Sequence, residues 1–245
     1  MKLLSPRGNR CVRDSFPVAG QDVPFALVKK AFVNGLLCLL MFGIPLFLGA
    51  GSLRFLNGWL FLGAFILPFL AVLLYFAFDN PDYFKKRVRG DEKERPQQVV
   101  MALLVLCALL MLLVSGLDYR FHWSSVPMQL VIASAVMMFA GFIMLFAVMK
   151  QNSFASRVIE VQRGQKVIDT GMYAVIRHPM YLAFTVIFGF APLVLGSLYS
   201  LIPAAIIPCL ISFRIKNEEA VLSKGLEGYD AYMKKIRYRL IPFVW

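Results

Sequence analysis

The sequence predicts an all-α polytopic membrane protein: a helix bundle with about six hydrophobic spans, the last two forming a short hairpin, and a C-terminal cytoplasmic helical segment. Three observations predict this fold class. Hydrophobic residues make up 59% of the 245 residues and charged residues only 16%, against about 45 to 50% and about 25% in soluble domains. Apolar runs long enough to cross a bilayer recur along the chain. The basic residues fall between those runs.

Apolar stretches bounded by charged residues are the candidate spans. The last two stretches are short, and only Ser197 and Leu198 separate them, which predicts a tight helical hairpin. Prolines within the hairpin, such as Pro192 and Pro208, predict bends. The six candidates are Ala31–Ala50, Phe55–Phe78, Val99–Leu117, Val126–Met149, Met180–Gly196 and Tyr199–Phe213.

The distribution of basic residues predicts the orientation in the membrane. Lys and Arg number 6, 1, 6, 1, 5, 0 and 7 in the successive segments outside the candidate spans. By the positive-inside rule both termini are cytoplasmic, and in a bacterial host the membrane would be the inner (plasma) membrane. The net charge of +12 is thus mostly a topology signal, accompanied by attraction to anionic membrane lipids, and it does not indicate nucleic-acid binding.

The chain divides into three regions on this basis. Residues 1–30 are expected to form a cytoplasmic N-terminal tail, residues 31–149 a four-span transmembrane region, and residues 150–245 the part that carries the chemistry. No Asp, Glu, Lys or Arg lies inside a candidate span, which argues against an ion-coupled transporter. The four cysteines are far apart, so neither a metal site nor a disulfide framework is indicated.

Two cytoplasmic stretches, 150–179 and 214–245, flank the predicted hairpin and should lie close together. In the first, Pro179 suits the first turn of a helix and holds His178 toward an extended conformation. His178 and free backbone amides would then lie at a helix N-terminus, where an anion is favoured by about 0.3 to 1 kcal/mol. Alternatively, His178 and Pro179 only mark the start of a helix, and Tyr181 is an interfacial anchor.

The second stretch begins with Arg214 and Glu218, which are four residues apart and share one face of a helix that continues from the last span. Glu218 can then pair with Arg214 or with a ligand. The alternative is an exposed ion pair worth only about 0.3 to 0.5 kcal/mol. An amphipathic stripe follows, which Gly225 and Gly228 are expected to break into two pieces. Its members are Leu222, Leu226, Tyr229 and Met233.

Taken together, these motifs resemble the isoprenylcysteine carboxyl methyltransferase and phospholipid methyltransferase family of integral membrane enzymes. The resemblance covers residues 150–245, and the short spacing before Tyr229 is closest to a bacterial-type member. The motifs are Gly171-x-Tyr173-x-x-x-Arg177-His178-Pro179-x-Tyr181, Arg214-x-x-x-Glu218-Glu219-x-x-Leu222, Tyr229-x-x-Tyr232 and Arg239-Leu240-Ile241-Pro242.

The resemblance implies a methyltransferase core over residues 150–245 that uses S-adenosyl-L-methionine in a cytosol-facing pocket. It implies a lipophilic or amphipathic methyl acceptor, such as an isoprenylcysteine-like carboxylate or a lipid headgroup, and no metal. Arg214 takes the catalytic, substrate-binding position. The implied cofactor-binding residues are Gln162, Gln165, Lys166, Val167, Ile168, Tyr173, His178, Pro179, Met180, Tyr181 and Glu218.

Two other interpretations stay open from the sequence. A membrane reductase of the sterol-reductase type, which uses NADPH, has a similar Tyr-Arg-x-Ile-Pro-like run near its C-terminus, as at Tyr238–Pro242 here. A non-catalytic scaffold or small transporter would use the polar clusters only as helix caps and interfacial anchors. The sequence does not identify the methyl acceptor or the oligomeric state.

Overall fold

The structure, a computed structural model, describes residues 25–81, 83–84, 95–154 and 158–245. Within these ranges the regular elements are all helices, and no strand occurs. The predicted all-α fold class is therefore confirmed for the described part of the chain. Of the tail predicted over residues 1–30, residues 1–24 lie outside the described residues, and residues 25–30 belong to the first helix.

Helices α2 and α5 follow the predicted apolar runs closely, whereas α1, α4 and α7 extend beyond theirs. Pro179 occupies the first turn of α6, as predicted, and Gly228 adopts a positive φ of 82° between α7 and α8, a conformation that costs glycine little. In chain order the elements are α1 (Phe25–Ala50), α2 (Leu56–Asp79), α4 (Arg95–Phe121), α5 (Met128–Gln151), the 3-10 helix η1 (Gly171–Ala174), α6 (Pro179–Val194), α7 (Leu201–Gly225) and α8 (Tyr229–Lys235).

Among the described helices, α1, α2, α4 and α5 are long and apolar enough to cross a membrane. The chain is thus an integral membrane protein. The exact count of six spans and the tight hairpin remain predictions. Helix α6 has only 16 residues, and the connection to α7 runs over residues 195–200 instead of the two residues expected. Helix α7 continues well beyond its apolar run and carries Arg214, Glu218 and Glu219 on one helix.

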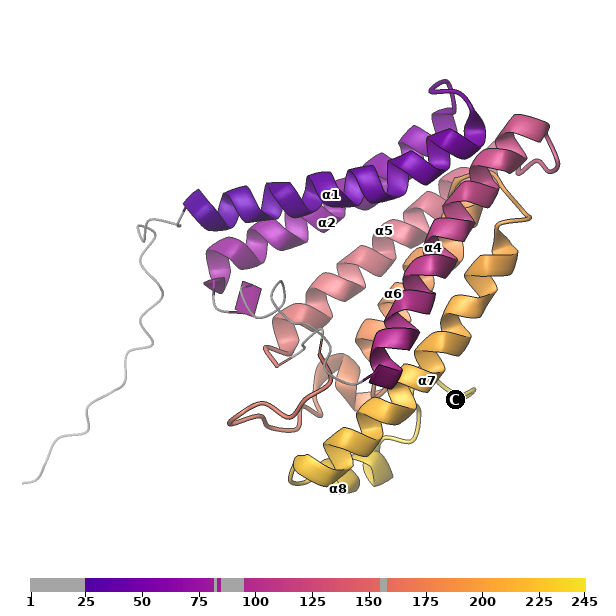
Figure 1. Ribbon diagram of the computed structural model, residues 1–245. Coiled ribbons are helices and arrows are strands. Elements are labelled where there is room, and N and C mark those ends of the chain that lie inside the picture. Colours follow the sequence, from indigo (N-terminus) through magenta and orange to yellow (C-terminus); the bar gives the residue numbers. More distant parts are fainter. Residues whose placement is uncertain (1–24, 82, 85–94, 155–157) are drawn as a thin grey trace, which may run out of the picture.

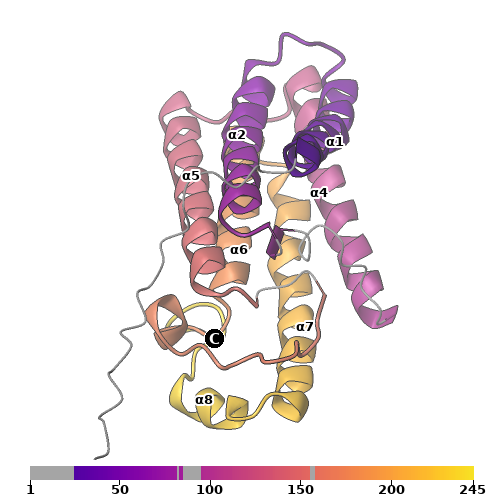
Figure 2. The ribbon, with the colours of Figure 1, turned by 90° about the vertical axis from the view of Figure 1, so that its left-hand side faces the viewer.

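The helices form two groups that meet at one end of the bundle. Helices α1 and α2 lie side by side and diverge from α4, α6 and α7 toward the end where α8 lies (Figure 1). Helix α5 packs along α6, and α7 packs against α4 and α6. Seen from the side, α8 and the irregular segment before α6 lie beyond the end of α5 and beside the last turns of α7 (Figure 2). Polar segments distant in sequence therefore meet there.

Aromatic side chains pack α2 against both α1 and α5. Phe65 of α2 packs edge-on to Phe42 of α1, with ring centroids 4.9 Å apart, and to Phe142 of α5, at 5.2 Å. Such edge-to-face pairs add about 0.5 to 1.5 kcal/mol beyond area burial. On the outside of α1, large apolar side chains such as Leu36 and Leu48 are exposed, as expected for a helix that faces lipid.

Helices α1 and α4 cross in close contact at two glycines. A Cβ on Gly116 would lie 2.2 Å from the Leu46 carbonyl oxygen, and a Cβ on Gly49 would lie 2.6 Å from the Leu113 carbonyl oxygen. Small residues allow such close backbone approach between membrane helices. This crossing fixes α4 relative to α1.

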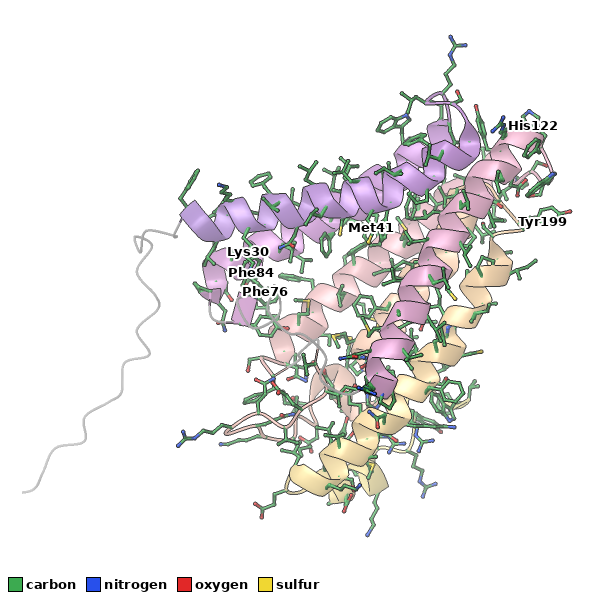
Figure 3. The ribbon with its side chains drawn as sticks, viewed as in Figure 1. Lys30, Met41, Phe76, Phe84, His122 and Tyr199 are labelled. Carbon is green, nitrogen blue, oxygen red and sulfur yellow. The ribbon has the colours of Figure 1, made fainter. Side chains whose placement is uncertain are left out.

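A buried carboxylate ties two connections together at the end of the bundle opposite α8. Asp118 is 1% exposed, although the sequence placed it just outside a span. It accepts hydrogen bonds from Ser124, at 2.7 Å from the backbone nitrogen and 2.6 Å from Oγ, and from Ser197 Oγ at 2.5 Å. His122 and Tyr199 lie at the same end (Figure 3). Asp118 thus links the α4–α5 connection to the α6–α7 connection.

Candidate active site

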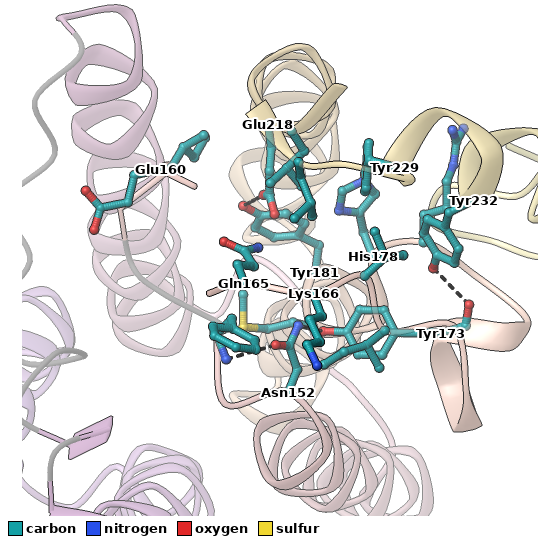
Figure 4. Close-up of a pocket in the computed structure, with 18 of the residues that line it drawn as sticks. Asn152, Glu160, Gln165, Lys166, Tyr173, His178, Tyr181, Glu218, Tyr229 and Tyr232 are labelled. Carbon is teal, nitrogen blue, oxygen red and sulfur yellow. Dashed lines mark hydrogen bonds between the residues drawn. The ribbon is translucent and has the colours of Figure 1, made fainter. Parts of the chain in front are cut away.

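A polar pocket lies at the end of the bundle where α5 ends, α6 begins and α8 packs on α7. Its empty space, including the part open to solvent, is about 830 Å³. Figure 4 shows carboxylate, amide, imidazole and phenol groups converging on it. Its walls are Asn152, Phe154, Val158, Ile159, Glu160, Gln165, Lys166, Val167, Ile168, Tyr173, Arg177, His178, Met180, Tyr181, Glu218, Leu222, Leu226, Tyr229 and Tyr232.

His178 is the residue that precedes α6, and its backbone is held by the C-terminal segment. The Arg177 amide donates to the Tyr238 carbonyl and the His178 amide to the Arg239 carbonyl, both at 2.9 Å. The amides of Tyr181 and Leu182 donate to the His178 carbonyl. The expectation of free amides at this helix start is therefore wrong for these residues. The imidazole itself is 5% exposed and lines the pocket.

Glu219 lies behind the pocket wall and joins three basic side chains. Its carboxylate is 3.2 Å from Arg177 Nε, 3.2 Å from His178 Nε2 and 2.8 Å from Arg239 Nε. Burial raises the pKa of Glu219, but the hydrogen bond with His178, the charge of Arg177 and the hydrogen bond with Arg239 lower it further than burial raises it. The carboxylate is thus ionised, and the Nε2–H of His178 points at it.

Glu218 faces the pocket and begins a hydrogen-bonded chain that runs away from it. The Tyr181 hydroxyl donates to Glu218 Oε2 at 2.6 Å and accepts from Arg214 Nε at 2.9 Å. Arg214 Nη1 in turn donates to Gln97 Oε1 at 3.2 Å. Arg214 is 5% exposed and does not line the pocket. The predicted pairing of Glu218 with Arg214 is therefore indirect, through a tyrosine.

Tyrosines and one asparagine form another part of the pocket wall. Asn152 Nδ2 donates to the Tyr173 hydroxyl at 2.9 Å, and the Tyr232 hydroxyl donates to the Tyr173 carbonyl at 2.8 Å (Figure 4). Burial, followed by the negative charge of Glu218, raises the pKa of Tyr229 above its ordinary value. The Tyr229 phenol is therefore neutral at physiological pH.

The segment before η1 closes one side of the pocket. Gln162 stabilises the conformation of this segment with two hydrogen bonds. Its side-chain Nε2 donates to the Phe154 carbonyl at 2.8 Å, and its backbone N–H donates to Gln165 Oε1 at 2.9 Å. Gly164, with φ 76°, makes the turn between the two glutamines. Gln162 is therefore a loop residue in this structure and does not line the pocket, whereas Gln165 does.

The structure brings most of the predicted cofactor residues to one place. Gln162 and Pro179 are absent from the walls. Arg214 lies behind Tyr181. Asn152 and Glu160 line the pocket but carry no motif, so they were not predicted. Tyr229 and Tyr232 were not predicted as pocket residues either, although the Tyr-x-x-Tyr motif was the available signal. The predicted residues that line the pocket are Gln165, Lys166, Val167, Ile168, Tyr173, His178, Met180, Tyr181 and Glu218.

A known protein family matches the part of the chain that holds most of this site. Residues 132–224 match the isoprenylcysteine carboxyl methyltransferase (ICMT) family. The matched segment runs from α5 into the end of α7 and holds His178, Tyr181, Arg214, Glu218 and Glu219. No curated protein matches the chain.

The ICMT match indicates a membrane methyltransferase and supports neither the reductase nor the non-catalytic interpretation. Methyltransferases of the ICMT family generally use S-adenosylmethionine. The chemistry of the pocket fits that group, because a carboxylate, an imidazole, a lysine and several tyrosines surround it. Among the described residues, no cluster of His, Cys, Asp or Glu is arranged to hold a metal ion.

Proposed function

We propose that the protein transfers a methyl group from S-adenosylmethionine to a lipophilic or amphipathic acceptor at the cytoplasmic face of the membrane. The observation that carries the proposal is that His178, before α6, and Glu218, on α7, line one pocket within the ICMT-matching segment. A carboxylate and an imidazole in the wall of one cavity suit a ligand that carries both an ammonium and a carboxylate group.

Each wall of the pocket has a role in this proposal. Glu218 would accept from the cofactor ammonium or ribose hydroxyls. The cofactor carboxylate would lie near His178, whose Nε2 is engaged by Glu219. Tyr173 and Tyr229 would contact the adenine with their rings, and the backbone of residues 165–168 would complete the site.

When bound, S-adenosylmethionine supplies an electrophilic methyl carbon, which the acceptor attacks in line. The task of the protein is then alignment and exclusion of water, and alignment alone can contribute about 7 to 11 kcal/mol at most. Arg214 would hold the acceptor carboxylate or phosphate through its planar guanidinium. The apolar cluster that includes Tyr181, with Ile211, Ile215 and Leu104, would keep water away and receive the lipophilic part of the acceptor.

The proposal includes the setting in the membrane. Residues 150–245 form the methyltransferase core, six spans cross the bilayer, and both termini are cytoplasmic. The pocket end then lies in the cytosol, in agreement with the excess of Lys and Arg in the segments at that end. A polar cofactor would enter from the cytosol, and the acceptor would enter laterally from the bilayer.

Two measurements on the detergent-purified protein test the proposal. The first compares binding of S-adenosylhomocysteine with binding of NADPH. The second incubates membrane lipid extracts with methyl-labelled S-adenosylmethionine and detects labelled products by mass spectrometry. Binding of S-adenosylhomocysteine together with a labelled lipid is the expected result. Binding of NADPH alone would favour the reductase, and no response to either ligand would favour a non-catalytic protein.

A further inference from the structure

Gln97 is a buried polar residue on a helix that the ICMT match does not reach. It lies in the first turn of α4, is 2% exposed, and precedes the matched residues 132–224 by a whole helix. A primary amide buried to this degree requires hydrogen-bond partners. Its Oε1 accepts from Arg214 Nη1 at 3.2 Å, so the partner is the side chain that the proposed function places at the methyl acceptor.

The Arg214 guanidinium is held from two helices at once. Tyr181 on α6 accepts from Nε at 2.9 Å, and Gln97 on α4 accepts from Nη1 at 3.2 Å. A guanidinium is planar, and its N–H groups point in fixed directions. Two acceptors on different helices therefore fix both the position of the group and its rotation about the last side-chain bond.

From these contacts we propose that Gln97 is a positioning residue that orients Arg214 toward the methyl acceptor, an inference that rests on the proposed function. Gln97 does not line the cofactor pocket. It acts on the acceptor side, where Arg214 lies behind Tyr181 and next to a cluster of Cys107 on α4 with Ile207 and Ile211 on α7. Helix α4 thus contributes to methyl transfer although it carries no family motif.

Gln97→Met tests whether Gln97 orients Arg214. Methionine has nearly the same length and volume as glutamine, so the space stays filled. Its side chain cannot replace the amide oxygen that accepts the hydrogen bond from Arg214. We expect the kcat/KM for the acceptor to fall by about tenfold or more, because misplacement of a group that orients the substrate is costly. The dissociation constant of S-adenosylhomocysteine should stay within about twofold of wild type, because Gln97 does not touch that pocket. Gln129→Met, on the exposed first turn of α5, is the matched control.

A double-mutant cycle with Arg214→Lys completes the test. If Gln97 acts through Arg214, then adding Gln97→Met to Arg214→Lys should lower kcat/KM by less than about twofold further. Three results would each overturn the inference. The first is that the two substitutions lower kcat/KM independently, so that their effects multiply. The others are unchanged turnover of Gln97→Met and a parallel loss of S-adenosylhomocysteine binding. If Gln97→Met does not fold, Gln97→Asn keeps an amide but withdraws its carbonyl, and the same outcomes apply to it. Absence of methyl transfer in the wild type would instead reject the proposed function.

Discussion

The Tyr181 hydroxyl lies 2.6 Å from Glu218 Oε2 and donates its proton to that carboxylate. The same oxygen accepts from Arg214 Nε at 2.9 Å. One phenol therefore lies between the carboxylate that faces the pocket and the guanidinium that lies behind it, and it fixes the distance between them.

Tyr181→Phe should loosen Glu218 without creating a cavity. The variant removes a hydrogen bond to a charged group, an interaction of about 1.5 to 3 kcal/mol. We expect the dissociation constant of S-adenosylhomocysteine to rise by about tenfold, measured by isothermal titration calorimetry in detergent. Tyr199→Phe, at an exposed position at the opposite end of the bundle, is the control. Equal affinity of both variants would mean that Tyr181 does not organise the pocket.

Glu218→Gln and His178→Ala should each weaken S-adenosylhomocysteine binding. Both side chains line the pocket, and each substitution removes a polar group that the proposal places next to the cofactor, so a loss of about tenfold is expected. Equilibrium binding to the purified variants measures it. Glu227→Gln changes an exposed glutamate outside the pocket and should bind like wild type. Normal affinity in both pocket variants would remove the assignment of this cavity to the cofactor.

Arg214→Ala should separate binding from turnover. The arginine lies outside the pocket walls, so S-adenosylhomocysteine affinity should change by less than about threefold. Methyl transfer to the lipid acceptor should be abolished, because nothing else in the proposal holds the acceptor. Lys216→Ala, at an exposed site on the same helix, controls for loss of a positive charge. A normal rate for Arg214→Ala would rule out its role at the acceptor.

Glu219→Gln should destabilise the protein in a pH-dependent way. Breaking a buried ion pair leaves uncompensated charge and costs about 3 to 5 kcal/mol. The pKa of Glu219 is lowered in the folded protein. The stability that it contributes is therefore fully present above the unfolded-state pKa of about 4.3 and is lost as the pH falls through the lower folded-state pKa.

Thermal unfolding in detergent checks this expectation. The gap between the melting temperatures of wild type and Glu219→Gln should be widest at neutral pH and should narrow as the pH falls below about 4. A gap that is constant over the whole pH range would show that the ionised carboxylate is not the source of the stabilisation.

Gly116→Ala should disrupt the crossing of α1 and α4. The added Cβ would lie 2.2 Å from a backbone oxygen, and overpacking of this kind costs about 1 to 3 kcal/mol. Gly63→Ala is a matched control, because a Cβ there meets nothing within 4 Å. The control should be neutral or more stable by up to about 1 kcal/mol, because alanine favours a helix over glycine. Thermal unfolding of both variants gives the comparison, and similar melting temperatures would contradict the close crossing.

Local features of the site were predictable from the sequence. The proline after His178 fixes the start of α6, and the spacing of Arg214 and Glu218 places both on one helix. The hydrophobic periodicity interrupted by Gly225 and Gly228 predicts where α7 ends and α8 begins. Each of these features depends on the backbone preference of one residue or on side chains a few residues apart. Sequence patterns indicate such local features directly.

Long-range contacts were not predictable in the same way. Arg239 reaches Glu219, and Gln97 reaches Arg214 across 117 positions of the chain. No spacing rule connects such residues, because only the packing of α4 on α7 brings the second pair together. The length of α4 was also underestimated, since its polar ends lie beyond the apolar run that identified it.

The C-terminal segment completes the site late in biosynthesis. Arg239 contacts Glu219, and the backbone amides of residues 177 and 178 donate to the carbonyls of residues 238 and 239. The last residue that lines the cavity is Tyr232, so every wall residue is synthesised before the residues that hold His178 and Glu219 in place. A chain that stopped between Tyr232 and Tyr238 would contain the whole lining of the cavity and lack these bonds. It would differ from the longer chain in how well it holds a ligand and not in its apolar helices.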